Sequence, residues 1–316
     1  MSLRTPPARV RRPRARVRWD LLVVVVMVWA GLGLLLYPAA ATWYADIGHR
    51  DAVTGYAREV EQTAPAARSR LLEDARRYNA SLPHGRLQDP WTSRDTAPGL
   101  DPGSYEQQLA LADAGGVIGR ISYPRLGIQL PIYHGTAPSV LTKGAGHLFG
   151  SSLPVGGAGS HAVLTSHSGY VHRLFDDLHE ARRGDLFAVN VLDQTLYYEV
   201  DGVETVEPDQ TESLRIEPGA DLLTLVTCTP IGVNSHRLLV RGHRVDAPAT
   251  PPAGTAILGP GADRAPAGFP WWLVLLLGGG GTATGAVVWL ARRDRRGRQG
   301  ESNEGESGEG DEGGSG

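Results

Sequence analysis

Residues 221–230 read DLLTLVTCTP, a pattern typical of a β-strand that ends at a proline. Successive side chains of a strand point to opposite faces, so Thr224, Val226 and Cys228 share one face. The other face carries Leu223, Leu225 and Thr227. Because Pro230 stops the strand, Cys228 is predicted to lie at its C-terminal end.

The sequence on both sides of this strand shows the same pattern of short strands and turns. From Val117 onward, short β-type runs alternate with turns rich in Gly, Pro, Asn and Asp. The other runs are IGRISYPRLGIQLPIY at 118–133, HAVLTSH at 161–167, DLFAVNVL at 185–192, QTLYYEV at 194–200 and HRLLVRGHRV at 236–245. The pattern predicts one compact, mostly β domain over residues 117–246.

The segment before this domain, residues 42–116, has a different composition. Residues 49–80 are rich in Ala, Arg and Glu and are expected to form a helical stalk. A Pro-, Gly- and Asp-rich loop follows at 82–103, with a short helix expected around Tyr105–Ala112. Loops of this length are usually functional or lack a fixed structure.

Two apolar runs flank the exposed part of the chain. Residues 21–41 (LLVVVVMVWAGLGLLLYPAAA) and 269–291 (FPWWLVLLLGGGGTATGAVVWLA) contain no charged residue. About 20 apolar residues suffice for a transmembrane helix. A cleaved signal peptide is the alternative for the first run, because Ala39–Ala41 could supply a cleavage site. The run exceeds the usual signal-peptide core, which favours an uncleaved anchor.

Arginines gather before the first run and after the second. They are Arg4, Arg9, Arg11, Arg12, Arg14, Arg16 and Arg18 on one side and Arg292, Arg293, Arg295, Arg296 and Arg298 on the other. By the positive-inside rule, the basic N-terminus (1–20) and the tail (292–316) are predicted to be cytoplasmic. Residues 42–268, including a Pro/Gly-rich linker at 247–268, would then lie outside the cell.

The charge and the cysteine and histidine content argue against several classes of function. Lys+Arg 31 against Asp+Glu 34 gives a formal net charge of −3, and the arginines concentrate at the termini, so nucleic acid is not an expected partner. One cysteine excludes an internal disulfide and any multi-cysteine zinc site. His134 and His147 lack the local spacing of metal ligands, so we expect no metal and no cofactor.

Cys228 therefore needs its own explanation. Taken alone, a cysteine among apolar residues is more often an inert buried side chain. A nucleophilic thiol needs a nearby cation or base and a donor for the oxyanion. His167 ends the strand 161–167 and could be the base, although a surface turn histidine is the alternative. Arg237 and Arg241 share one strand face, and alternation cannot choose between them.

Three motifs together resemble the sortases, in particular the class C, pilin-polymerising sortases. They are TSHSGY at 165–170, TLVTCTP at 224–230 and NSHRLLVRG at 234–242. The resemblance runs from Asp89 to Val245 and includes SYPRLGIQLPIYHGT at 122–136, GAGHLFGSSLPVGG at 144–157 and VEPDQTESLRIEPG at 206–219. It implies a closed eight-stranded β-barrel with short helices.

The resemblance also implies roles for individual residues. Cys228 matches the nucleophile, His167 the histidine, and Arg237, nine residues after the cysteine, the arginine of the family. Asp89-Pro90-Trp91 matches the lid of class C enzymes, in which the aspartate reaches the arginine and the aromatic ring covers the cysteine. Without the resemblance, Asp89-Pro90-Trp91 would be read as a turn.

The function implied is that of a cysteine transpeptidase in a Gram-positive type cell envelope. Cys228 would cleave an LPXTG-like sorting signal between Thr and Gly, and the thioester would pass to a pilin lysine. The expected partners are LPXTG-bearing pilin or surface proteins and the membrane. Two alternatives remain: a housekeeping-type sortase that attaches proteins to a cell-wall precursor, and a catalytically silent membrane scaffold.

Overall fold

A computed structural model describes residues 19–83, 87, 89, 100–169, 174–252, 255 and 269–306. The described residues fall into two compact units, which divide the chain between Ala40 and Ala41 and again between Phe269 and Pro270. The larger unit, Ala41–Phe269, holds all the strands.

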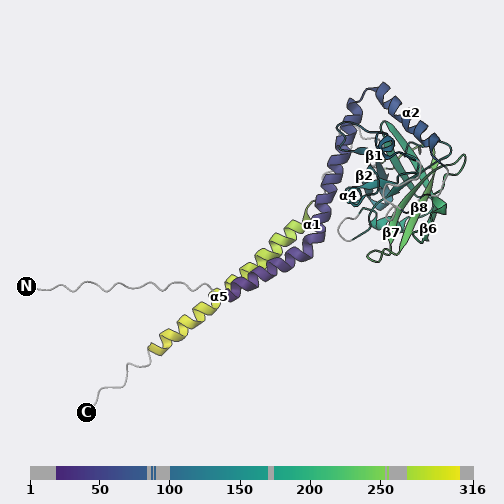
Figure 1. Cartoon of the computed structure of the whole chain (residues 1–316). Helices are drawn as coiled ribbons and strands as arrows, with labels where there is room; N and C mark the ends of the chain where they lie inside the picture. Colours follow the sequence, from purple (N-terminus) through teal and green to yellow (C-terminus); the bar gives the residue numbers. More distant parts are fainter. Residues whose placement is uncertain are drawn as a thin grey trace, which may run out of the picture. The chain divides into compact units, whose positions relative to one another are not determined.

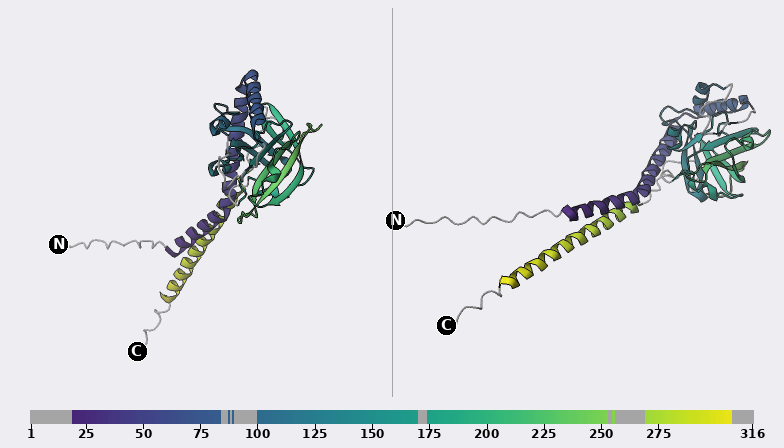
Figure 2. Two further views of the ribbon diagram at one scale, coloured as in Figure 1. Left: turned by 45° about the vertical axis from the view of Figure 1, so that its right-hand side comes forward. Right: turned by 60° about the horizontal axis from the view of Figure 1, so that its bottom comes forward.

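The larger unit is a closed barrel of eight strands (Figures 1 and 2). Around the barrel the strands follow the order β1, β2, β3, β4, β7, β8, β6, β5. Their bounds are β1 Val117–Tyr123, β2 Ile128–His134, β3 Ala145–His147, β4 Ser160–Thr165, β5 Leu186–Val191, β6 Gln194–Val206, β7 Asp221–Thr229 and β8 His236–Val245. The predicted fold class, a closed eight-stranded barrel with short helices, is confirmed.

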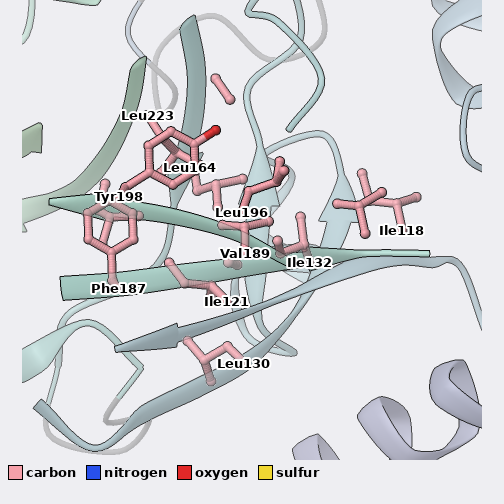
Figure 3. Close-up of a cluster of buried hydrophobic side chains, with 14 of the residues drawn as sticks. Ile118, Ile121, Leu130, Ile132, Leu164, Phe187, Val189, Leu196, Tyr198 and Leu223 are labelled. Carbon is pink, nitrogen blue, oxygen red and sulfur yellow. The ribbon is translucent and has the colours of Figure 1, made fainter. Parts of the chain in front are cut away.

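One large apolar cluster fills the barrel, and alternation explains its membership. Leu223 and Leu225 of β7 point into this cluster, whereas Val226, between them and Cys228, belongs to a separate apolar cluster. Figure 3 shows side chains from six strands converging on the interior. They include Ile118, Ile121, Leu130, Ile132, Leu164, Phe187, Val189, Leu196, Tyr198 and Leu223.

Strand β3 was not predicted, because it has only three residues and begins in a glycine-rich stretch. It pairs with β2 in parallel and with β4 antiparallel. A side chain at Gly146 would place its Cβ 2.3 Å from the Gly135 carbonyl oxygen, and one at Gly144 would lie 2.4 Å from that of Pro131. The glycines therefore permit close backbone packing that hydrophobic periodicity cannot reveal.

The helical stalk differs from the single helix expected at 49–80. Helix α1 is Trp19–Gln62, and α2 is Pro65–Ser81. The break coincides with Pro65 at the start of α2, a position that suits proline because the first helical N–H needs no partner within the helix. The Tyr56 hydroxyl of α1 donates to the Ile118 carbonyl oxygen at 3.1 Å and accepts from the Leu192 amide at 2.7 Å. These bonds fix the C-terminal part of α1 on the barrel.

The short helix expected around Tyr105–Ala112 begins and ends earlier. Helix α3 is Pro102–Glu106, with Asp101 accepting hydrogen bonds from the Gly103 and Ser104 amides. Leu109 has a φ of 56°, which is incompatible with a continuing right-handed helix. The remaining helical pieces are α4 Pro138–Leu141 and the 3₁₀ turns η1 Pro124–Leu126, η2 Asp176–Glu180 and η3 Glu212–Leu214.

One residue of the predicted linker is packed into the barrel unit. Thr255 is fully buried, and its carbonyl oxygen accepts a 3.4 Å hydrogen bond from the Asn190 amide group. Its own amide donates to the Pro252 carbonyl oxygen at 3.1 Å. Thr255 of the predicted linker therefore packs against β5 of the barrel.

The smaller unit contains the N-terminal part of α1 and α5 (Trp271–Glu306). Both helices include a window long and apolar enough to cross a membrane, within Trp19–Gln62 and Trp271–Arg293. A Cβ at Gly280 would lie 2.5 Å from the Trp29 ring, so the glycine makes room for the indole. The Trp29 indole N–H donates to the Thr284 hydroxyl at 3.1 Å. The two apolar helices thus pack through a small residue, as membrane helices commonly do.

Candidate active site

Three strand ends meet at one rim of the barrel. Strand β4 runs parallel to β7, and β7 runs antiparallel to β8. In the second pair Cys228 lies directly opposite Arg237. Directly opposed residues project to the same face of a sheet, so the thiol and the guanidinium emerge side by side.

His167 lies just beyond the end of β4, at the level of Cys228. The Thr227 hydroxyl donates to the Ser166 carbonyl oxygen at 2.9 Å, and the Ser168 hydroxyl donates to the Cys228 carbonyl oxygen at 2.7 Å. Both neighbours of His167 are therefore bonded to the end of β7. His167 itself is half-buried. The topology thus brings the predicted histidine, cysteine and arginine to one rim.

Asp89 forms an ion pair with Arg237. The Arg237 Nε and Nη2 donate to the two carboxylate oxygens at 2.7 and 3.0 Å. The pair is nearly shielded from solvent, with the Arg237 and Asp89 side chains 9% and 4% exposed. Arg237 Nη1 also donates to the carbonyl oxygens of Asn234 and His236, both at 3.2 Å. This bidentate geometry is the strong form of an arginine–carboxylate contact.

Arg241 has a different position from Arg237. It lies opposite Thr224, four residues from Cys228 along β7, and its Nε donates to Asp201 at 2.9 Å. Its Nη1 is 3.6 Å from Glu217. Arg241 is therefore held in a surface ion-pair cluster away from the thiol.

Of the five predicted site residues, the structure places Asp89, His167, Cys228 and Arg237 at this rim. Trp91 lies outside the described residues. The lid loop as a whole is described only at its ends and at Leu87 and Asp89.

The surroundings of Cys228 favour the protonated thiol. Burial raises the pKa of Cys228, the Arg237 guanidinium lowers it, and the Asp89 carboxylate raises it. Cys228 is 7% exposed. Burial is the largest of these effects on the pKa, and Asp89 partly offsets the cation that would stabilise a thiolate.

The sequence analysis missed a second cluster of buried apolar residues beside the thiol. We call it the apolar socket: Leu148, Val163, Leu214, Val226 and Leu239. Leu87 and Val206 pack against it. The Thr211 hydroxyl donates to the Leu87 carbonyl oxygen at 2.6 Å. One sequence signal was available, since Val226 shares a face with Cys228 and apolar residues on that face need a cover.

Of the two histidines considered as metal ligands, His147 is hydrogen-bonded within the barrel unit, and the His134 ring packs edge-on against Tyr105 with ring centroids 4.6 Å apart. The Tyr105 hydroxyl lies 2.8 Å from His147 Nδ1, and His147 Nε2 lies 2.8 Å from the Ser152 carbonyl oxygen. Burial lowers the pKa of His147 to about 3 and that of His134 to about 4. Within the described residues no three His, Cys, Asp or Glu side chains are grouped so that they could hold a metal ion.

Comparisons with known proteins agree with this geometry. The sortase domain family matches residues 121–245. Sortase A of Bacillus anthracis is 31% identical over 144 residues, which are 46% of this chain and 67% of the relative. The crystal structure of sortase C-1 from Actinomyces oris is 46% identical, with a TM-score of 0.54, and covers 57% of this chain and 99% of its own. A pilus-related sortase C of Group B Streptococcus is 39% identical, with a TM-score of 0.55, and covers 61% of this chain and 96% of its own.

The structural relatives are matched over almost their whole length at identities well above those that show only a fold. The one cysteine of the chain lies at the barrel rim, opposite an arginine and level with a histidine. The chain therefore belongs to the sortase family and is a cysteine transpeptidase.

Proposed function

We propose that this chain is a membrane-anchored class C sortase that joins pilin subunits covalently. The observation that carries the proposal is the bidentate contact between Asp89 and Arg237, directly beside Cys228. A carboxylate from a preceding loop that occupies the site arginine matches the aspartate of the class C lid. The similarity to a pilus-related sortase C supports the same class.

In the proposed reaction Cys228 gives its thiol proton to His167, and the resulting thiolate attacks the threonine carbonyl carbon of an LPXTG-like signal. The Thr–Gly C–N bond breaks, the departing amine takes a proton from His167, and the carbonyl carbon stays bound to sulfur as a thioester. A pilin lysine amine then attacks the thioester and gives a proton to His167, and the sulfur leaves. The products are an isopeptide bond and the free enzyme.

Arg237 is proposed to donate hydrogen bonds either to the developing oxyanion or to the substrate backbone. Its Nε and Nη2 are bonded to Asp89 in the resting arrangement, so the lid has to move before Arg237 can serve a substrate. Trp91 is proposed as the second lid residue on the resemblance alone.

The proposed topology places the barrel outside the cell and both termini in the cytoplasm. Two helices with windows suited to a membrane flank the barrel in sequence, and arginines lie beyond them on the distal sides. In this arrangement 21–41 and 269–291 span the membrane, 42–116 forms the stalk and lid, 117–246 is the catalytic barrel and 247–268 is the linker.

The test uses the full chain in detergent micelles with an LPXTG-like peptide. Intact-mass and peptide-level spectrometry should find the threonine end of the peptide bound to Cys228, and Cys228→Ala should abolish the adduct. If no adduct forms with the lid opened by Asp89→Ala, the proposed reaction is wrong. Continued covalent polymer formation in cells that carry Cys228→Ala would favour the scaffold.

A housekeeping sortase is the second candidate, favoured by the similarity to sortase A of Bacillus anthracis. The two candidates differ in the amine that resolves the thioester. Offering the acylated enzyme a pilin lysine peptide and a cell-wall peptide amine at equal concentration separates them. Faster resolution by the wall peptide would replace the pilin assignment.

A further inference from the structure

We propose that the cavity beside Tyr105 binds a primary ammonium group on a short alkyl stem, the chemistry of a lysine side chain presented by a partner protein. The cavity has a volume of about 160 Å³ and lies where α3, the end of β2 and α4 meet. Its described lining includes none of the residues that surround Cys228, and β4 separates β3 from β7 in the barrel order. The inference concerns binding and goes beyond the proposed transpeptidation.

The first step is the aromatic wall of the cavity. Tyr105 of α3, His134 of β2 and Phe149 all line it. The Tyr105 ring centroid is 4.6 Å from that of His134 at an interplanar angle of 85°, and 4.8 Å from that of Phe149 at 44°. The rings therefore form a corner and not a stack. Aromatic faces attract ammonium groups, and proteins use this attraction to enclose alkylammonium ligands in aromatic cages.

The second step is an unused hydrogen-bond acceptor in this wall. The His134 Nε2 atom is buried and has no hydrogen-bond partner among the described residues. Burial lowers the pKa of His134 to about 4, against a hydrogen bond between the imidazole and the Gln108 backbone that raises it. The imidazole is therefore neutral at pH 7, and the nitrogen that does not donate is an acceptor. A buried acceptor without a donor costs free energy, which an N–H group of a bound ammonium would recover.

The third step is the charge at the open side of the cavity. Pro102 and Glu106 line the cavity and are exposed to solvent, so they mark its mouth. The Glu106 carboxylate forms no ion pair within the part of the chain that the structure describes, and the described lining contains no lysine or arginine. A neutral acceptor inside and a carboxylate at the mouth favour a cation over an anion. An ammonium group suits both, since it carries a positive charge and several donors.

The fourth step is the rigidity and size of the cavity. The Tyr105 hydroxyl lies 2.8 Å from His147 Nδ1, donates to the His147 carbonyl oxygen at 3.0 Å and accepts from the Gly135 amide at 3.1 Å. These contacts hold the ring in place before any ligand binds, which lowers the cost of binding. A cavity of about 150 Å³ accepts benzene. An n-butylammonium ion has fewer heavy atoms than benzene, so the stem of a lysine side chain fits.

The test measures binding of n-butylammonium to the full chain in neutral detergent micelles at pH 7, by ligand-observed nuclear magnetic resonance. His134→Phe keeps a ring and removes the acceptor, so it should weaken binding roughly tenfold. Val140→Phe enlarges a side chain that lines the cavity and should abolish the binding. Circular dichroism checks that each variant is folded.

Glu106→Gln tests the charge at the mouth through an exposed residue, so it bears on the inference even if a substitution in the wall prevents folding. It should weaken n-butylammonium binding roughly threefold at low salt, and the difference from the parent should shrink at high salt. Glu73→Gln is the matched control, because Glu73 is also an exposed glutamate, but on α2 and outside the lining of the cavity. The control should bind n-butylammonium as tightly as the parent does. Equal binding by the two glutamine variants at low salt would contradict the role of Glu106.

Two other ligands test the chemistry of the bound group and its source. The neutral analogue 1-butanol should bind at least roughly tenfold more weakly than n-butylammonium. Lysine with both its α-amine and its carboxyl group blocked as amides should bind about as tightly as n-butylammonium. Binding of blocked lysine at least roughly tenfold weaker would assign the site to a free amine and overturn the lysine of a partner.

The outcomes are independent of the proposed function, because no readout uses the chemistry of Cys228. Equal binding of 1-butanol and n-butylammonium would refute a site for a cation. Binding of n-butylammonium that neither His134→Phe nor Val140→Phe changes would place it outside this cavity. No binding to the parent chain would mean that the cavity holds water only, and the inference would be wrong.

Discussion

Replacing Asp89 by asparagine should open access to Cys228 and make its thiol more reactive. Asparagine keeps the size of the side chain and removes the charge that pairs with Arg237 through two hydrogen bonds of 2.7 and 3.0 Å. A hydrogen bond to a charged group is worth about 1.5–3 kcal/mol, so the contact of this side chain with Arg237 should weaken by about 2 kcal/mol. Since 1.4 kcal/mol is a factor of ten, the open population should rise about 30-fold.

The pH dependence of the same variant follows from the Cys228 pKa. Asp89 is one of the causes that raise this pKa, and Arg237 lowers it. Loss of the aspartate charge therefore lowers the pKa, and the variant should reach its maximal alkylation rate at lower pH than the parent. In the parent, the pKa of Cys228 should be higher with Asp89 bound to Arg237 than without it, so rising pH should favour release of Asp89 between those two pKa values.

The assay is alkylation of the full chain with iodoacetamide, followed by intact mass at several pH values. The matched control is Asp201→Asn, which removes an ion-pair partner of Arg241 on the same barrel face, two layers away from the thiol. The control should alkylate at the parent rate. If Asp89→Asn reacts no faster than Asp201→Asn, or its pH profile of alkylation moves to higher pH, Asp89 does not lower the reactivity of the Cys228 thiol.

Three other predictions concern the fold. Burial lowers the pKa of His147 from 6.5 to about 3, so the unfolded chain binds an extra proton between these pH values. The free energy of unfolding should therefore fall as pH drops through this range. Urea midpoints at pH 7 and 4.5 should differ more for the parent than for His147→Gln. Gly146→Ala should lower the unfolding free energy by about 2 kcal/mol through overpacking. Gly55→Ala should raise it by about 0.5–1 kcal/mol, because Gly55 lies within α1 and a Cβ there would meet no atom within 4 Å. Denaturant titration measures both changes. Gly280→Val should lower the melting temperature of the helix pair in detergent because the Trp29 ring fills that space, while Gly278→Val, with nothing within 4 Å, should change it little.

Alternation predicted most of the strands, whereas their closure into an eight-stranded barrel was implied by the resemblance. The faces assigned to β7 agree with the clusters that its side chains join. Strand β3 was not predicted because its glycine-containing sequence shows no hydrophobic periodicity. Its position is set by backbone contacts with residues distant in sequence. The break before α2 was signalled by Pro65 and was overlooked because the composition stays helical on both sides.

The site was predictable as a set of residues and not as an arrangement. Alternation placed Arg237 and Arg241 on one face and could not choose between them, because the choice depends on the register between β7 and β8. That register puts one arginine opposite Cys228 and the other opposite Thr224. Leu87 and Thr211 were missed because their partners are more than a hundred residues away in sequence or on other strands.

The pleat of β7 sets the distance between the apolar socket and the thiol. Val226 and Cys228 are successive outward residues, about 6.5–7 Å apart along the strand, and that interval is a property of the backbone. Substitutions can reshape the socket or retune the thiol, but they leave the interval between the two unchanged. Variation at this rim can therefore change the side chains around the thiol, whereas their spacing along β7 stays constant unless a bulge shifts the strand.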